Sequence, residues 1–274
     1  MMRLLPSTLA LAAVLVAPDV SAQGVDTVYA EVHGHPIAFY LMGTSGPTVV
    51  MEAGGGSWHR DWLTIAPQLA QHARVITYDR PGYSLSAGCE SPRTADRVSR
   101  ELWTALEYLG HNGPYILVGW SLGGAYARVF AGTYPDQIRG LVLVDPAPED
   151  FYRRMPREFP EEWSAAVAEH FPAVYGDSTR RGEARELAAF DASVEQARAS
   201  DAKHQAPTIV LIAGRDGEVA EDPISRVWVE ELKEWAARRP NTTASVVPQI
   251  GHHIPAQAPD AIVQAVIELI HRTR

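Results

Sequence analysis

The sequence has little cysteine and little positive charge, and each shortage excludes a class of protein. Cys89 is the single cysteine among 274 residues, which excludes an internal disulfide framework and a cysteine-based metal site. Lysine and arginine together number 24 against 33 aspartates and glutamates, giving a formal net charge of −9. Nucleic-acid binding requires a basic face, so we expect no nucleic-acid partner. No internal repeat and no low-complexity tract occurs, and nothing in the pattern specifies a number of subunits.

Apolar runs long enough to cross a membrane are missing as well. The run at residues 9–17 is shorter than the roughly 20 residues of a membrane-spanning helix. It follows Arg3 and precedes Val20-Ser21-Ala22, which has the small residues that a signal peptidase requires. We therefore expect residues 1–22 to be a signal peptide and the mature protein to be exported, to the periplasm or outside the cell. A buried N-terminal helix is the alternative.

Short apolar runs alternate with segments of helical length along the rest of the chain. Runs typical of strands buried on both faces of a sheet lie at 48–51, 73–78, 115–118, 141–144 and 208–212. Apolar residues at helical spacing lie at 94–109, 224–239 and 259–272. This alternation predicts an α/β fold whose central sheet is mostly parallel and flanked by helices. Residues 28–32 and 36–41 around Gly34 predict an additional hairpin.

Residues 146–206, called the insertion below, interrupt that alternation. The segment has no convincing strand and is far longer than an ordinary connection between two core strands. It is charged and rich in alanine, with scattered aromatic residues such as Phe151 and Phe190. We expect a helical cap over one end of the sheet, because the aromatic side chains need a surface to pack on. A partly disordered loop is the alternative.

The segment Gly119-Trp120-Ser121-Leu122-Gly123 follows a predicted strand and precedes a predicted helix. In that context G-x-S-x-G is typical of a nucleophile elbow, a sharp turn that exposes the serine hydroxyl. Glycines on both sides of the serine avoid collisions in such a turn, and the helix N-terminus supplies positive potential beside it. Ser121 is therefore the candidate nucleophile, and an idle serine in a glycine-rich turn is the alternative.

Five short segments occur along the chain in an order that resembles the α/β-hydrolase superfamily. They are Glu52-Ala53-Gly54-Gly55-Gly56-Ser57, Tyr78-Asp79-Arg80-Pro81-Gly82-Tyr83-Ser84, the serine elbow, Leu143-Val144-Asp145-Pro146 and Gly251-His252. The resemblance implies a hydrolase core formed by residues 23–145 and 207–274, with the insertion as its cap. It also disfavours dehalogenases and epoxide hydrolases, which have an aspartate at the position of Ser121.

The resemblance implies that His252 is the base that activates Ser121. The chain order Ser…Asp…His also fits this fold. His253 is the nearest rival, and the family register favours the histidine directly after glycine. We expect the remaining histidines to lie at the surface; they are His33, His35, His59, His72, His111, His170, His204 and His271.

The acid that orients His252 has two main candidates. The usual family site follows the strand at 208–212, where Asp216 stands one residue closer to the preceding glycine than in many relatives. Some branches instead place the acid where Asp145 stands, at the tip of the preceding strand. We favour Asp216 and keep Asp145 as the alternate acid, with Glu218 and Asp222 as remoter options.

Two backbone N–H groups are expected to form the oxyanion hole. One belongs to Leu122, directly after the nucleophile, and the other to Gly55, where relatives usually carry His-Gly. A phosphate-binding loop is the alternative for this glycine run, but no Gly-Lys-Ser/Thr follows it. We interpret Asp79-Arg80 as a charged pair that stabilises a loop beside the site, and Trp58, Trp62 and Trp120 line the acyl pocket or pack in the core.

The expected activity is cleavage of a carboxylic ester or lactone in a small-molecule substrate by a serine esterase, without metal or cofactor. The first alternative is hydrolysis of short peptides or amides, with Glu158, Glu161 or Glu162 receiving a substrate amine. The second is a binding protein that kept the fold and lost the chemistry.

Overall fold

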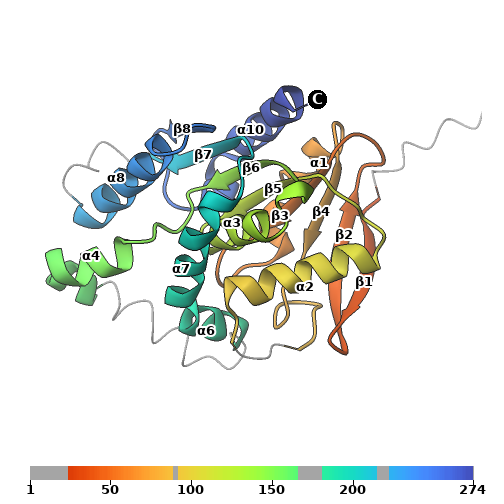
Figure 1. Ribbon diagram of the computed structural model, residues 1–274, viewed down its shortest axis with the longest axis horizontal. Coiled ribbons are helices and arrows are strands. Elements are labelled where there is room, and N and C mark those ends of the chain that lie inside the picture. Colours follow the sequence, from red (N-terminus) through yellow and green to blue (C-terminus); the bar gives the residue numbers. More distant parts are fainter. Residues whose placement is uncertain (1–23, 89–91, 166–180, 215–221, 274) are drawn as a thin grey trace, which may run out of the picture.

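A computed structural model describes residues 24–88, 92–165, 181–214 and 222–273. In these residues eight strands form one sheet, in the order β1-β2-β4-β3-β5-β6-β7-β8 (Figure 1). The strands are β1 (Asp26–Val32), β2 (His35–Met42), β3 (Thr48–Glu52), β4 (Arg74–Tyr78), β5 (Tyr115–Trp120), β6 (Ile138–Val144), β7 (Thr208–Ala213) and β8 (Thr242–Val247). From β4 to β8 every neighbouring pair is parallel, whereas β1–β2 and β2–β4 are antiparallel. The predicted α/β class, the mostly parallel sheet and the hairpin around Gly34 are confirmed.

Helices cover both faces of the sheet. They are α1 (Ala66–Leu69), α2 (Ala95–Tyr108), α3 (Leu122–Thr133), α4 (Phe151–Glu158), α6 (Arg181–Ala188), α7 (Phe190–Ser200), α8 (Pro223–Ala237), α9 (Ile254–Gln257) and α10 (Pro259–Arg272). Apolar side chains of α2, α3, α7 and α8 pack in one core cluster, and those of α1 and α10 pack in another on the opposite face. The strands between them are buried on both sides, which explains their unbroken apolar runs.

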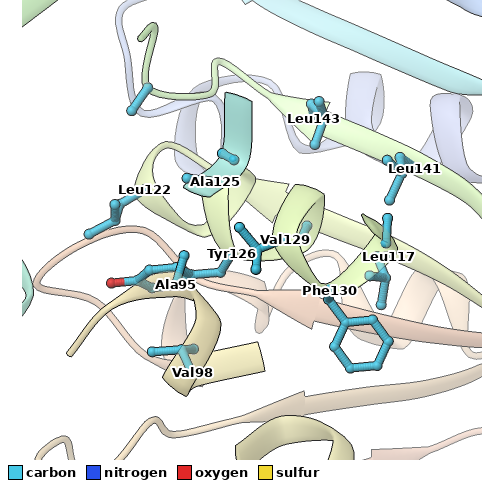
Figure 2. Close-up of a cluster of buried hydrophobic side chains, with 14 of the residues drawn as sticks. Ala95, Val98, Leu117, Leu122, Ala125, Tyr126, Val129, Phe130, Leu141 and Leu143 are labelled. Atoms are coloured by element: carbon cyan, nitrogen blue, oxygen red, sulfur yellow. The ribbon is translucent and has the colours of Figure 1, made fainter. Parts of the chain in front are cut away.

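Helix α3 lies at the centre of the first cluster. All its residues from Leu122 to Ala131 are buried, because α2, α7 and the sheet surround it. Figure 2 shows Tyr126 and Val129 of α3 between Val98 of α2 and Leu117 of β5. The helix that follows the candidate nucleophile is therefore held on several sides by packing.

The described parts of the insertion are mainly helical, and they pack on the core and line a cavity. Helix α7 joins the core: the backbone N–H of Ala95 donates to Ser193 Oγ at 3.0 Å, and Gly132 of α3 faces Ser200 so closely that a Cβ would lie 2.7 Å from its carbonyl oxygen. Helices α4 and α6, together with Phe190 at the start of α7, contribute side chains to a cavity beside Ser121. The cap predicted for residues 146–206 thus contains one helix that packs as part of a core layer.

The predicted signal peptide, residues 1–22, lies outside the described residues. Within the described part of the chain, no helix is long and apolar enough to span a bilayer.

Candidate active site

Ser121 occupies the tight turn between β5 and α3. Its backbone has φ 54° and ψ −121°, a positive φ that non-glycine residues rarely adopt. A Cβ at Gly119 would lie 2.5 Å from the carbonyl oxygen of Gly123, and one at Gly123 would lie 2.4 Å from that of Ala53. The two glycines are needed because backbones approach closely on both sides of the serine.

Three side chains that lie far apart in the sequence form a continuous chain of hydrogen bonds. His252 Nε2 lies 2.9 Å from Ser121 Oγ, and His252 Nδ1 lies 2.7 Å from Asp145 Oδ2. Asp145 is completely buried, whereas the His252 side chain is 37% exposed. This arrangement can move a proton from the serine hydroxyl to the ring while a carboxylate stabilises the resulting imidazolium.

Among the described residues, the carboxylate that engages His252 belongs to Asp145, the alternate acid, and not to the favoured Asp216. Asp216 and Glu218 lie outside the described residues, but the Nδ1 of His252 is already engaged by Asp145. Asp145 reaches it because β6 ends beside β5, and the turn after β6 has φ 40° at this aspartate. Asp222 caps α8 by accepting the N–H groups of Ile224 and Ser225. The alternate acid is therefore the one that the structure places in the site.

His253, the rival base, contacts Trp120 and Asp61, whereas His252 is the histidine that contacts Ser121 Oγ. The His253 ring stacks on Trp120, with ring centroids 4.6 Å apart, and its Nε2 lies 3.8 Å from Asp61 Oδ1. Trp120 Nε1 also donates to the backbone carbonyl of His252 at 3.0 Å. The residue before Ser121 thus stabilises the loop that carries the His252 ring.

Gly55 and Leu122 both line the cavity beside Ser121. Leu122 is the first residue of α3, so its N–H has no acceptor within the helix. The N–H of Gly56 donates to Tyr83 Oη at 3.2 Å, and among the described residues none accepts the N–H of Gly55. The geometry brings together the two residues predicted for the oxyanion hole and leaves their donors available.

Arg80 does not pair with its neighbour Asp79, contrary to the interpretation from sequence. Its guanidinium is fully buried and donates to the carboxylate of Glu52 at 2.7 Å and to that of Glu186 in α6 at 2.6 Å. It also donates to the carbonyl oxygens of Ala53 at 2.7 Å and Gly54 at 2.6 Å. Burial raises the pKa of Glu52, whereas Arg80 opposes that rise. Arg80 therefore stabilises the glycine loop and links it to the insertion.

Asp79 has different partners. Its carboxylate accepts a hydrogen bond from Tyr40 Oη at 2.8 Å and lies 2.7 Å from His59 Nδ1. The His59 side chain is only 19% exposed, and both ring nitrogens of His204 are buried, so the expectation that these two histidines lie at the surface was wrong. No local sequence signal identifies such partners, because they come from distant segments.

Comparison with known proteins agrees with the geometry. Residues 47–182 match a family model described as alpha/beta hydrolase fold. This chain belongs to the α/β-hydrolase superfamily. The enol-lactonase from Burkholderia xenovorans LB400 superposes with a TM-score of 0.68 at 20% identity, covering 89% of this chain and 100% of that one. The haloalkane dehalogenase DbeA from Bradyrhizobium elkani superposes with a TM-score of 0.69 at 18% identity, covering 91% and 99%.

Curated relatives of this α/β-hydrolase match over shorter segments. The uncharacterized protein YqjL of Bacillus subtilis (strain 168) is 34% identical over 105 residues, which cover 38% of this chain and 42% of YqjL. The first curated relatives are matched over less than half of their own length.

In this α/β-hydrolase the cavity beside Ser121 has a volume of about 400 Å³. Its aromatic lining residues are Trp120, Phe151, Tyr152, Trp163, Phe190 and Trp228. Trp62 is instead completely buried in the core, and Trp58 stacks against the guanidinium of Arg60 at 3.6 Å. Of the three tryptophans considered from sequence, Trp120 is the one that lines this cavity.

Proposed function

We propose that this chain is a serine hydrolase that cleaves a carboxylic ester or lactone through an acyl-enzyme. The chain of hydrogen bonds from Ser121 through His252 to Asp145 carries the proposal, because it contains a nucleophile, a base and an orienting acid at bonding distances. The superfamily supports a hydrolytic enzyme, and the printed name of the enol-lactonase neighbour agrees with lactone chemistry in this fold.

The reaction follows from these positions. Ser121 Oγ attacks the carbonyl carbon while His252 Nε2 takes the hydroxyl proton, and the N–H groups of Gly55 and Leu122 stabilise the oxyanion. The tetrahedral intermediate collapses, His252 returns the proton to the leaving alcohol oxygen, and an ester to Ser121 remains. Water then attacks this acyl-enzyme with His252 as base, which releases the carboxylic acid and restores the serine hydroxyl.

The amide-hydrolysing alternative loses its proposed recognition residues. Glu158 forms ion pairs with Arg154 and Arg157, and Glu161 and Glu162 are exposed. These glutamates are not among the residues that line the cavity beside Ser121.

A fluorophosphonate probe separates the enzyme from a binding protein that lost its chemistry. We expect the wild-type chain to be labelled and Ser121→Ala to stay unlabelled, because the probe reacts with an activated serine. Ser245→Ala is the matched control, since Ser245 is exposed on β8. Equal labelling of the wild-type chain and Ser121→Ala would remove the support for the proposal. A panel of p-nitrophenyl esters, lactones and amides would then define the bond that is cleaved.

We also propose that residues 1–22 direct export and are removed after Ala22. The charged start, the short apolar run and the small residues before the cleavage point support this. N-terminal sequencing of protein recovered from an exporting bacterial host should begin at Gln23. A retained Met1 in exported protein would contradict the proposal.

A further inference from the structure

The two peptide planes that adjoin Gly55 are each held by a buried side chain. The carbonyl oxygen of Gly54 accepts a hydrogen bond from Nη2 of Arg80 at 2.6 Å. Because a peptide unit is planar, this bond also restrains the direction of the Gly55 N–H, which belongs to the same unit. On the other side of Gly55, the N–H of Gly56 donates to the hydroxyl of Tyr83 at 3.2 Å. The predicted oxyanion donor thus lies between two anchored planes.

One carboxylate of the insertion holds both of these anchoring side chains. Oε1 of Glu186 in α6 accepts from Nε of Arg80 at 2.6 Å, and Oε2 accepts from Nη2 at 3.1 Å. Oε2 also accepts from the hydroxyl of Tyr83 at 2.7 Å. Arg80 and Glu186 are both 1% exposed, so water has little access to these bonds. The orientation of both planes therefore depends on a side chain from a distant segment of the chain.

The guanidinium of Arg80 cannot turn without losing hydrogen bonds. A guanidinium carries five N–H donors in a rigid plane. Besides its bonds to the α6 carboxylate and to Gly54, Arg80 donates to the carbonyl oxygen of Ala53 and to Glu52, both at 2.7 Å. Its position is therefore set jointly by the end of β3 and by α6. A charged donor on the Gly54 carbonyl also polarises that peptide, which makes the Gly55 N–H a stronger donor.

Helix α6 also packs directly against these loops. A Cβ at Gly182 would lie 2.8 Å from Cε2 of Tyr83, and one at Gly56 would lie 2.6 Å from the carboxyl carbon of Glu183. Glu183 and Glu186 are three residues apart, so they share one face of the helix. These contacts make α6 a support of the glycine loop as well as a wall of the cavity.

We propose that Glu186 is a positioning residue for the oxyanion hole. Through Arg80 and Tyr83 its carboxylate aligns the Gly55 N–H, so that this donor is in place only while α6 is docked on the core. The inference rests on the proposed ester or lactone hydrolysis, and it gives the insertion a part in stabilising the transition state. Alignment of the donor matters most in that state, where the substrate oxygen carries the charge.

Glu186→Gln tests this role, because it keeps the shape of the side chain and removes the charge that holds both anchors. We expect kcat for p-nitrophenyl acetate to fall about 10-fold with KM changed by less than about 2-fold, since outright removal of an oxyanion donor costs about 10²–10³. The ketone 2,2,2-trifluoroacetophenone adds to the serine and places an oxyanion in the hole, so its inhibition should weaken by the factor by which kcat/KM falls. An unchanged kcat in folded Glu186→Gln protein, or a loss confined to KM, would overturn the inference.

Asp201→Asn is the matched control for that experiment. Asp201 follows α7 in the insertion, and its Oδ1 accepts from Nε of Arg128 in α3 at 2.8 Å. This variant also removes a carboxylate from a buried ion pair between the insertion and the core, but its partners Arg128 and Trp235 belong to α3 and α8. We expect a lower free energy of unfolding with wild-type kcat and wild-type inhibition by the ketone. Equal losses of kcat in the two variants would contradict the positioning role.

Glu186→Asp decides the matter if Glu186→Gln does not fold. It keeps the charge, but its carboxylate is one methylene shorter and falls short of holding Arg80 and Tyr83 together. We expect a several-fold lower kcat and an equally weakened inhibition by the ketone. A wild-type kcat in this variant would contradict the inference.

Failure of this inference differs from failure of the proposed function. If the fluorophosphonate labels the wild-type chain at Ser121 and Glu186→Gln is as active as the wild-type chain, the hydrolytic role stands and the role given to Glu186 falls. If the wild-type chain is not labelled, the hydrolytic role falls and this inference falls with it.

Discussion

Oδ1 of Asp145 accepts the backbone N–H of Ala213 at 3.0 Å, at the end of the neighbouring strand β7. Its other oxygen, Oδ2, faces His252. The backbone N–H of Asp145 also donates to the carbonyl oxygen of Leu211 at 2.7 Å. The strand ends of the sheet thus help to orient the carboxylate that faces His252.

Asp145→Asn tests this assignment with little change in shape. The amide oxygen can still accept the N–H of Ala213, but the amide nitrogen then faces His252 Nδ1 and stabilises the wrong ring tautomer. We expect kcat to fall by about 10⁴-fold, the loss typical of a triad acid. Asp216→Asn should retain most of the activity in the same ester assay. A severe loss in Asp216→Asn with a mild loss in Asp145→Asn would reverse the assignment.

Tyr83→Phe tests whether the glycine loop is positioned by contacts outside the cavity. The Tyr83 hydroxyl accepts the N–H of Gly56 and donates to Glu186 at 2.7 Å, so its removal loosens the loop that presents Gly55. We expect kcat to fall about 10-fold with little change in KM, because the oxyanion contact strengthens only in the transition state. Steady-state kinetics with one neutral ester measures both constants.

Tyr115→Phe is the matched control for that experiment. Its hydroxyl donates to the carbonyl of His111 at 2.6 Å, and Tyr115 begins β5, at the opposite end of this strand from Ser121. We expect a lower unfolding free energy and an unchanged kcat. Equal losses of kcat in the two variants would indicate a general effect of stability and not a role in positioning.

Trp120→Phe removes one hydrogen bond to the loop that carries the base. A phenyl ring can still stack on His253, but the carbonyl of His252 loses the indole N–H. A net contribution of about 1 kcal/mol for this bond corresponds to a roughly 5-fold slower reaction of Ser121 with a fluorophosphonate. Trp103→Phe, which alters a stacked pair with Tyr134, should react at the wild-type rate. A wild-type rate in Trp120→Phe would exclude this role.

Glu231 should make stability depend on pH. Burial raises its pKa to about 7, although Arg154 lies 3.3 Å from its carboxylate and opposes the shift. The folded chain therefore binds this proton more tightly than the unfolded chain. As the pH rises from about 4.5 to 7, ionisation of this carboxyl lowers the free energy of unfolding by a growing amount. We expect the difference in free energy of unfolding between Glu231→Gln and the wild-type chain to increase by about 1–2 kcal/mol, in favour of the variant, from pH 5 to pH 8. Urea unfolding at the two pH values, with Glu230→Gln as control, measures the difference; a gain that does not change with pH would contradict this assignment.

Local patterns were sufficient for most of the fold and for the nucleophile. Strands buried on both faces need unbroken apolar runs, and a tight strand-to-helix turn needs glycines where backbones meet. Each of these patterns is contained in a few consecutive residues and can therefore be recognised in the sequence. The choice of His252 as the base followed from the family resemblance, with which the order of elements agrees. Helix α7 was less predictable, because its apolar residues match a cap and a core layer equally well.

The sequence by itself determined the α/β class, the elbow at Ser121 and the candidate glycine loop, since each depends on neighbours along the chain. Only the tertiary structure brought Asp145 to His252, and it alone paired Arg80 with Glu186. These contacts join residues about a hundred positions apart. Which carboxylate reaches a given cation or ring depends on how strands and helices pack. The spacing of two residues along the sequence does not determine the distance between their side chains in space.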